Sequence, residues 1–158
     1  MLGPSQLSTL LPGIWTLRAT TFPLWRSGRR LSPTFSYRLL PGRTLRLHDS
    51  VSYRTRTGES RRILGTDTFR EATGDFVWRG SGVLAPLSAA WRVSGSNGDG
   101  TVLVLRFSRT LVTPAGIDVL ARLAGDSRDL DERLLRDADQ YRLSTAEVRS
   151  LTWLRPAG

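Results

Sequence analysis

The chain has 158 residues and a formal net charge of +9, and it contains neither cysteine nor lysine, so all 23 basic residues are arginines. The absence of cysteine excludes a disulfide framework, a thiolate metal site and a cysteine nucleophile, while the absence of lysine excludes Schiff-base chemistry. No run of about eighteen apolar residues is present, so we expect no membrane-spanning helix.

The length predicts one domain that covers residues 1–158. The N-terminal stretch has no basic residue before Arg18 and is interrupted by Pro4 and Pro12, unlike a secretory signal, so a cytoplasmic location is the expectation. The positive charge is a feature of nucleic-acid-binding proteins. The arginines are spread over many segments instead of clustering on one helix, and nucleic acid is therefore not the partner that we expect.

The predicted elements begin with one or two helical turns at residues 5–11, which Ser5 can cap and which Pro12 and Gly13 end. From residue 13 to residue 107, large apolar residues alternate with polar ones, most often arginine. Successive side chains of a strand point to opposite faces, so each run places its aromatics on one face and its guanidinium groups on the other. Eight strands are predicted, at residues 13–20, 34–40, 43–48, 50–56, 61–69, 75–80, 89–94 and 101–107.

After residue 112 the apolar spacing is typical of helices. Thr113 and Pro114 begin a predicted helix that ends at Gly125, a second helix covers about 128–141, and Ser144 with Glu147 forms a capping box for a third. The predicted class is mainly β: an eight-stranded antiparallel up-and-down β-barrel over 5–112, including the N-terminal helical turn, followed by a C-terminal helical segment at 113–158. Closure is favoured because it removes the exposed edges of a flat sheet.

The triplet Gly13-Ile14-Trp15 on the first predicted strand resembles the G-x-W signature of lipocalins and related calycins. The resemblance implies that Trp15 lies near the closed end of the barrel, covered by an arginine of the last strand, here Arg106 or Arg109. Further strings resemble an uncharacterised group of bacterial and fungal lipocalin-like proteins. This second resemblance implies a fold and a cavity but no reaction. These strings are Phe22-Pro23-Leu24-Trp25, Pro33-Thr34-Phe35, Gly65-Thr66-Asp67, Phe76-Val77-Trp78-Arg79-Gly80 and Thr113-Pro114-Ala115-Gly116.

The aromatic face of the barrel has two interpretations: it fills the interior as a solid core, or it lines a pocket for a small hydrophobic molecule. In the second, residues 22–30 form a lid and Arg26 binds a carboxylate on the ligand; the alternative is a loop folded onto the barrel wall. The predicted ligand-binding residues are Trp15, Trp25, Arg26, Phe35, Tyr37, Tyr53, Phe76, Trp78 and Trp91.

An alternative function is that of a cofactor-independent cyclase, isomerase or dehydratase that acts on a polyketide- or terpene-like substrate in secondary metabolism. Tyr37 and Tyr53 could donate protons and Asp67 could be a buried general base, or these groups could be ordinary hydrogen-bonded or ion-paired core residues. His48 is the only histidine, and the glycine-rich segments lack the spacing of a phosphate-binding loop. We therefore expect neither a metal nor a cofactor.

Overall fold

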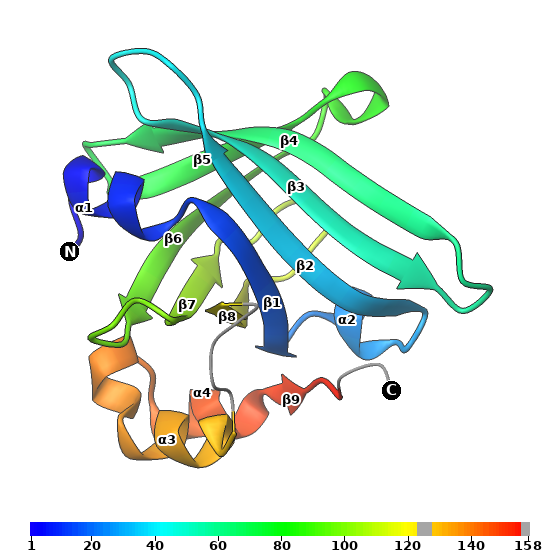
Figure 1. The fold of residues 1–158 in the computed structure, drawn as a ribbon, viewed down its shortest axis with the longest axis vertical. Helices are drawn as coiled ribbons and strands as arrows, with labels where there is room; N and C mark the ends of the chain where they lie inside the picture. Colours follow the sequence, from blue (N-terminus) through cyan, green and yellow to red (C-terminus); the bar gives the residue numbers. More distant parts are fainter. Residues whose placement is uncertain (123–127, 156–158) are drawn as a thin grey trace.

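The computed structural model describes residues 1–122 and 128–155, and its centre is a closed antiparallel barrel (Figure 1). Each strand pairs with the next one in sequence, and β1 closes the barrel by pairing with both β8 and β2. The predicted eight-stranded up-and-down barrel is confirmed. Its strands are β1 (Gly13–Thr20), β2 (Arg30–Leu39), β3 (Arg46–Thr55), β4 (Ser60–Arg70), β5 (Asp75–Gly80), β6 (Ser88–Ser96), β7 (Val102–Phe107) and β8 (Gly116–Arg122).

The predicted number of barrel strands is right because two errors cancel: one strand is predicted as two, and another strand is missed. The segments 43–48 and 50–56 belong to one strand, β3, in which Asp49 pairs with Tyr37 of β2 and Gly65 of β4 instead of beginning a turn. The predicted helix over 113–125 is wrong, because residues 116–122 form β8, so the barrel extends beyond residue 112; residues 123–125 lie outside the described part of the chain.

The strand β8 lacks polar alternation because both of its faces are buried, as they are in the neighbouring strand β7. Leu120 packs inside the barrel, whereas Ile117 and Val119 pack outside it against the C-terminal helices. A short apolar run that is buried on both faces has no period of two and is easily mistaken for a helix. This double burial explains why the sequence pattern failed at β8.

The C-terminal segment covers the outer side of β7 and β8 (Figure 1). It contains α3 (Leu130–Arg136), the 3-10 turn η2 (Ala138–Tyr141) and α4 (Thr145–Ser150), and it ends in β9 (Thr152–Trp153), which pairs with Ala19 and Thr20 of β1. The predicted capping box of Ser144 and Glu147 is confirmed at the start of α4. In residues 1–122 and 128–155, no helix has the length and apolar character needed to cross a membrane.

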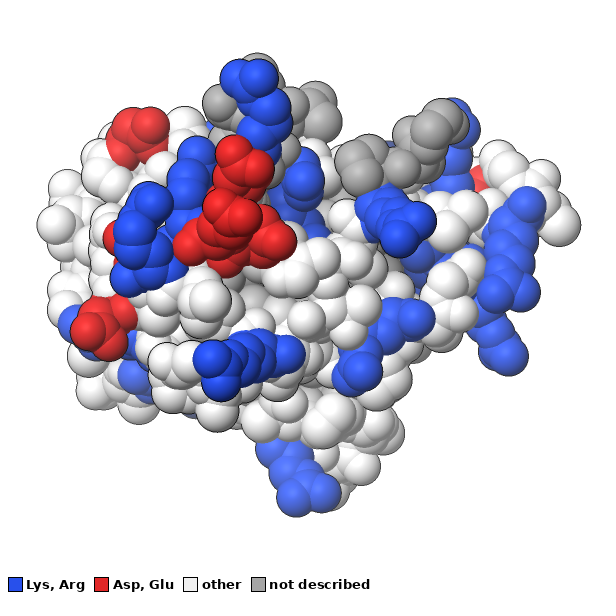
Figure 2. All heavy atoms as spheres, turned by 90° about the horizontal axis from the view of Figure 1, so that it is seen from below, with Lys and Arg blue, Asp and Glu red and all other residues white. Residues whose placement is uncertain are grey.

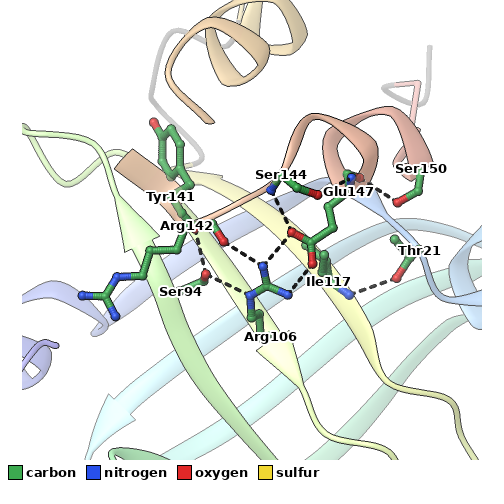
Figure 3. Close-up of polar contacts among 9 residues, drawn as sticks. All are labelled: Thr21, Ser94, Arg106, Ile117, Tyr141, Arg142, Ser144, Glu147 and Ser150. Carbon is green, nitrogen blue, oxygen red and sulfur yellow. Dashed lines mark hydrogen bonds and ion pairs between the residues drawn. The ribbon is translucent and has the colours of Figure 1, made fainter. Parts of the chain in front are cut away.

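Arg106 of β7 joins this helical segment to the barrel (Figure 3). Its guanidinium group donates to both carboxylate oxygens of Glu147, at 2.8 and 2.9 Å, to the carbonyl oxygen of Arg142 at 2.7 Å and to the hydroxyl of Ser94 at 3.2 Å. These hydrogen bonds lower the pKa of Glu147 to about 2. Arg106 is therefore occupied on the outer side of the barrel.

The other end of the barrel is closed by α1 (Pro4–Leu10), which confirms the N-terminal helical turn but begins after Gly3, so the predicted Ser5 cap is wrong. Trp15 is fully buried there, and its indole N–H donates to the carbonyl oxygen of Leu11 at 2.9 Å. The guanidinium carbon of Arg122 lies 3.8 Å from the centre of the Trp15 ring. Arg122 also donates to the carbonyl oxygens of Leu10, at 2.6 Å, and Pro12, at 2.8 Å.

The arginine that covers Trp15 is thus Arg122, and the expectation of Arg106 or Arg109 is wrong. Its cause is the missed strand β8, since the last barrel strand carries this arginine. Gly13 has a φ of 122°, and a Cβ atom there would collide with the Arg122 guanidinium group. Gly13 therefore leaves room for the Arg122 guanidinium group, and Trp15 supplies the ring that this group covers.

Replacing Arg122 by alanine is expected to lower the free energy of unfolding by about 2–4 kcal/mol, because it removes two charge-assisted hydrogen bonds and the cation–π contact. Urea denaturation followed by tryptophan fluorescence measures the change. Arg38→Ala, at an exposed position of β2, is the matched control and should change the stability by about 0.5 kcal/mol or less. Equal effects of the two substitutions would contradict this role of Arg122.

Candidate functional site

The half of the barrel away from α1 contains a cavity of about 210 Å³. Its floor is a stack of three rings, in which Trp91 lies between Tyr37, at 5.7 Å, and Phe76, at 4.5 Å. Both sequence interpretations therefore hold for part of the barrel, because the end near α1 is solid and the opposite end, which we call the open end, is hollow. The apolar wall consists of Phe22, Leu24, Trp25, Phe35, Val51, Ile63, Trp78, Ala89, Trp91 and Phe107.

The short helix α2 (Pro23–Arg26) in the β1–β2 connection covers this cavity. Trp25 is buried, with its ring centre 6.3 Å from that of Phe35 and 5.9 Å from that of Tyr53. Phe22 meets Phe107 edge to face at 5.3 Å and lies where a side chain at Gly116 would collide with it. The predicted lid segment thus contains a helix that contributes apolar side chains to the cavity.

Three carboxyl groups are buried at or directly behind the cavity wall. Asp49 and Asp118 line the cavity, while Asp67 is completely buried and accepts a hydrogen bond from the Trp91 indole N–H at 2.9 Å. Asp118 accepts a hydrogen bond from the Thr20 hydroxyl at 2.6 Å. Within the described residues, no arginine forms an ion pair with any of the three.

Asp49 and Asp67 form a pair on the inner face of the neighbouring strands β3 and β4. Asp49 is opposite Gly65 and Asp67 is opposite Leu47, so the two side chains are diagonal neighbours within hydrogen-bonding reach. One oxygen of each, Asp49 Oδ1 and Asp67 Oδ2, has no other partner among the described residues. A proton held by Asp49 and donated to Asp67 compensates both carboxyl groups.

Burial raises the pKa values of these groups because the charged form loses its hydration. The pKa of Asp118 rises to about 7, and that of Asp67 rises to about 6 against the opposing hydrogen bonds from Asp49 and Trp91. The pKa of Asp49 is raised well above its ordinary value by burial and by the negative charge of Asp67. Burial and the nearby carboxylates also raise the pKa of Tyr37, so this phenol stays protonated.

The structure brings together part of the predicted site. The predicted residues that line the cavity are Trp25, Phe35, Tyr37, Trp78 and Trp91, and Asp67 is directly behind Trp91. Phe76 supports Trp91 from the side away from the cavity, and Trp15 lies at the end closed by α1.

Two further predicted residues lie apart from the cavity. Tyr53 contacts the edge of Trp25 and carries the Arg30 guanidinium group 5.5 Å from its ring centre. Arg26 is exposed and lies in a groove on the outer surface beside Leu31 and Trp153.

The sequence analysis missed Asp49 and Asp118 as site residues. Asp49 was assigned to a turn, although an unbroken strand over 43–56 would have placed it on the same face as Leu47 and Val51. Asp118 was hidden in the predicted helix. Because His48 and Asp49 point to opposite faces of β3, they do not form a pair.

Comparisons with known proteins give similarity in structure alone. No family model matches the chain, and a search of curated proteins finds no match. Among solved structures, lobster apocrustacyanin A1 matches with a TM-score of 0.66 at 8% identity, over 95% of this chain and 79% of that one. The siderocalin Ex-FABP, described as functioning through dual ligand specificities, matches with a TM-score of 0.62 at 15% identity, over 94% of this chain and 95% of that one.

H1 crustacyanin from the lobster Homarus americanus also matches, with a TM-score of 0.63 at 8% identity, over all of this chain and 87% of that one. Together with the closed barrel, the N-terminal helix and the C-terminal helices, these similarities define a lipocalin-like, or calycin, fold. Membership of the bacterial and fungal lipocalin-like group stays a prediction.

The buried carboxyl groups predict that the protein is less stable at pH 8 than at pH 5. Their folded pKa values lie above the unfolded value near 4, so folding takes up protons and the free energy of unfolding falls as the pH rises through the folded pKa values. We expect a loss on the order of 3 kcal/mol in urea denaturation. In Asp118→Asn the loss should be smaller; a wild-type stability that stays constant or increases over this range would refute the assignment.

Proposed function

We propose that the barrel binds a small, largely apolar molecule in the cavity beneath α2. The observation that carries this proposal is the aromatic cavity with polar groups on one side, the usual composition of a small-molecule site. Its volume of about 210 Å³ is below the roughly 300–1,000 Å³ of drug-sized sites, so the ligand is compact, with one or two rings.

The polar groups of the cavity determine which ligands are suitable. The sequence suggested a ligand carboxylate bound by Arg26, but Arg26 is exposed on the outer surface, and the cavity is lined by Asp49 and Asp118. Acidic side chains repel an anion and accept hydrogen bonds from donors. The cavity therefore supports a ligand that donates hydrogen bonds over one that carries a carboxylate.

A second candidate function is proton-transfer catalysis without a cofactor, by an isomerase, cyclase or dehydratase. The observation that favours it is a carboxyl group with a pKa of about 7, Asp118, on the wall of the same cavity as the protonated phenol of Tyr37. A general base works best with a pKa near the operating pH, and a phenol can stabilise a developing enolate by donating a hydrogen bond. The polyketide- or terpene-like substrate, the role in secondary metabolism and the cytoplasmic location stay predictions.

Ligand binding is tested with 1-naphthalenemethanol, a neutral two-ring alcohol, by isothermal titration calorimetry. We expect saturable binding with one site per chain. Ala89→Leu, which fills the cavity, should weaken binding at least tenfold, whereas Ala90→Leu, one residue further on β6 and on its opposite face, should leave it unchanged. Binding that is insensitive to Ala89→Leu would place the ligand elsewhere.

Proton transfer is tested by NMR as the exchange of the α-protons of 2-tetralone, a two-ring ketone, in D₂O. The second candidate predicts that the protein accelerates this exchange and that Asp118→Asn and Tyr37→Phe each reduce the acceleration at least tenfold. Tyr53→Phe is the control, because Tyr53 does not line the cavity. An exchange rate equal to that of buffer would leave ligand binding as the proposed function.

A further inference from the structure

We infer that the ligand of this cavity is an organic cation, a protonated amine on a compact apolar body, whose ammonium group binds at the acidic side of the cavity that Asp49 and Asp118 line, with Asp67 buried behind it. This inference rests on the proposed function and adds the chemical class of the ligand. The observation behind it is the group of three buried carboxyl groups, without an arginine partner in the described part of the chain, on one side of an aromatic cavity.

The chain has arginine in excess, and yet its ion pairs form on the surface. Arg92 pairs with Asp75, Arg106 with Glu147, and Arg61 with Glu59, whereas Asp67 and Asp118 accept hydrogen bonds from neutral donors and Asp49 pairs with Asp67. A buried carboxylate without a cation is costly, and buried charges in proteins are usually paired. A cation that enters with the ligand supplies the missing partner.

The positions of the acceptor oxygens suit an ammonium group. Asp49 and Asp118 are part of the cavity wall, and the Asp49–Asp67 pair and Asp118 have no cationic partner among the described residues. An ammonium group has up to three donors and no acceptor, so it can donate to more than one carboxyl oxygen. The titratable groups that line the cavity are Asp49, Asp118 and the Tyr37 phenol, while Asp67, the Thr20 hydroxyl and the Trp91 indole N–H lie behind them as hydrogen-bond partners.

The remaining walls favour a cation that has an apolar body. The indole rings of Trp25 and Trp78 line the cavity, and ring faces attract an alkylammonium group by cation–π interaction. No guanidinium group lines this cavity. In the described part of the chain, no set of three or more acidic or histidine side chains converges closely enough to hold a metal ion, which favours an organic cation.

Three naphthalene ligands of equal size test the inference by calorimetry at pH 7.5: 1-naphthylmethylamine, 1-naphthalenemethanol and 1-naphthoate. We expect the amine to bind at least tenfold more tightly than the alcohol, and naphthoate to bind more weakly than either. The amine should also bind more tightly at pH 7.5 than at pH 5, where the carboxyl groups are protonated. In the double variant Asp49→Asn/Asp67→Asn the preference for the amine should disappear while the alcohol still binds.

Glu71→Gln, at an exposed acid outside the cavity, is the control for net charge and should keep the preference. If the alcohol binds as tightly as the amine to the wild-type protein, the cation inference is wrong and the proposed function stands. If none of the three ligands binds, the proposed function fails as well. The ligand series on the wild-type chain decides these outcomes even if a variant does not fold.

A different part of the molecule supports a second inference: we propose that the open end of the barrel docks onto the surface of an anionic lipid bilayer. The loops at this end expose aliphatic side chains, with Val83 at 95%, Leu111 at 106% and Val112 at 78% of full exposure. Leu24 on α2 and Leu87 in the β5–β6 connection are also exposed. Aliphatic side chains on neighbouring loop tips are suited to insertion into the boundary between lipid headgroups and acyl chains.

The charges at the open end are complementary to anionic headgroups. Exposed arginines accompany the aliphatic loops, and the one acid in the β3–β4 turn, Glu59, is paired with Arg61. Figure 2 shows that most acidic residues of the face in view gather toward one side, with arginines among them, whereas the side toward the β3–β4 turn has arginines and little acid. The arginines at this end are Arg26, Arg29, Arg56, Arg79 and Arg109. Basic side chains near a bilayer are attracted to its anionic headgroups.

Cosedimentation with phosphatidylcholine vesicles, with and without 30% phosphatidylglycerol, tests this docking. We expect binding to the anionic vesicles only, with a loss of at least tenfold in Leu111→Ser/Val112→Ser. Leu39→Ser, at an exposed leucine on the opposite end of β2, is the control and should bind normally. No binding to anionic vesicles would overturn the proposal. Binding that weakens in salt but ignores the double variant would also overturn it, because it indicates simple attraction to polyanions such as nucleic acid.

Discussion

A carboxyl group enclosed in an apolar barrel must obtain a proton, a hydrogen-bond donor or a cation, and the interior of this protein depends on how that requirement is met. Asp67 accepts a hydrogen bond from the Trp91 indole N–H, Asp118 accepts one from the Thr20 hydroxyl, and Asp49 retains its proton. None of these partners is a cation, so the negative charge that the Asp49–Asp67 pair and Asp118 acquire near neutral pH is not balanced by a positive group beside it. The cavity is consequently acidic inside a protein whose net charge is +9.

The barrel separates a solid core from a cavity along its axis. At the end closed by α1, Trp15 and Arg122 fix the N-terminal segment to the last barrel strand. The stacked rings around Trp91 end the solid core and form the floor of the cavity, so the cavity wall rests on closely packed groups that cannot easily move. The C-terminal helices bury the outer face of β7 and β8.

The sequence predicts the barrel and most of its aromatic cavity, because six of its eight strands, all except β7 and β8, have one buried and one more solvated face and therefore alternate. The failures are at the places where this condition is not met. Asp49 is a polar residue on a buried face and appeared to interrupt β3, while β8 is buried on both faces and lost its period of two. The strand β8 carries Asp118 and Arg122. This one misassigned strand therefore concealed one of the three buried carboxyl groups and the arginine that covers Trp15. Arg26 lies in a groove on the outer surface because of the path of the β1–β2 connection, and residue patterns do not determine the path of a loop.

The short strand β9 ties the C-terminal segment to the connection between β1 and α2. After β2 leaves β1, the backbone of Ala19 and Thr20 would be an open edge, and Trp153 and Thr152 pair with it instead. Thr20 also holds Asp118 through its hydroxyl, and the same hydroxyl accepts the backbone N–H of Phe22, where α2 begins. The start of α2, one acid of the cavity and the strand β9 thus share two consecutive residues, so a disturbance at β9 reaches the cavity wall through a path only a few bonds long.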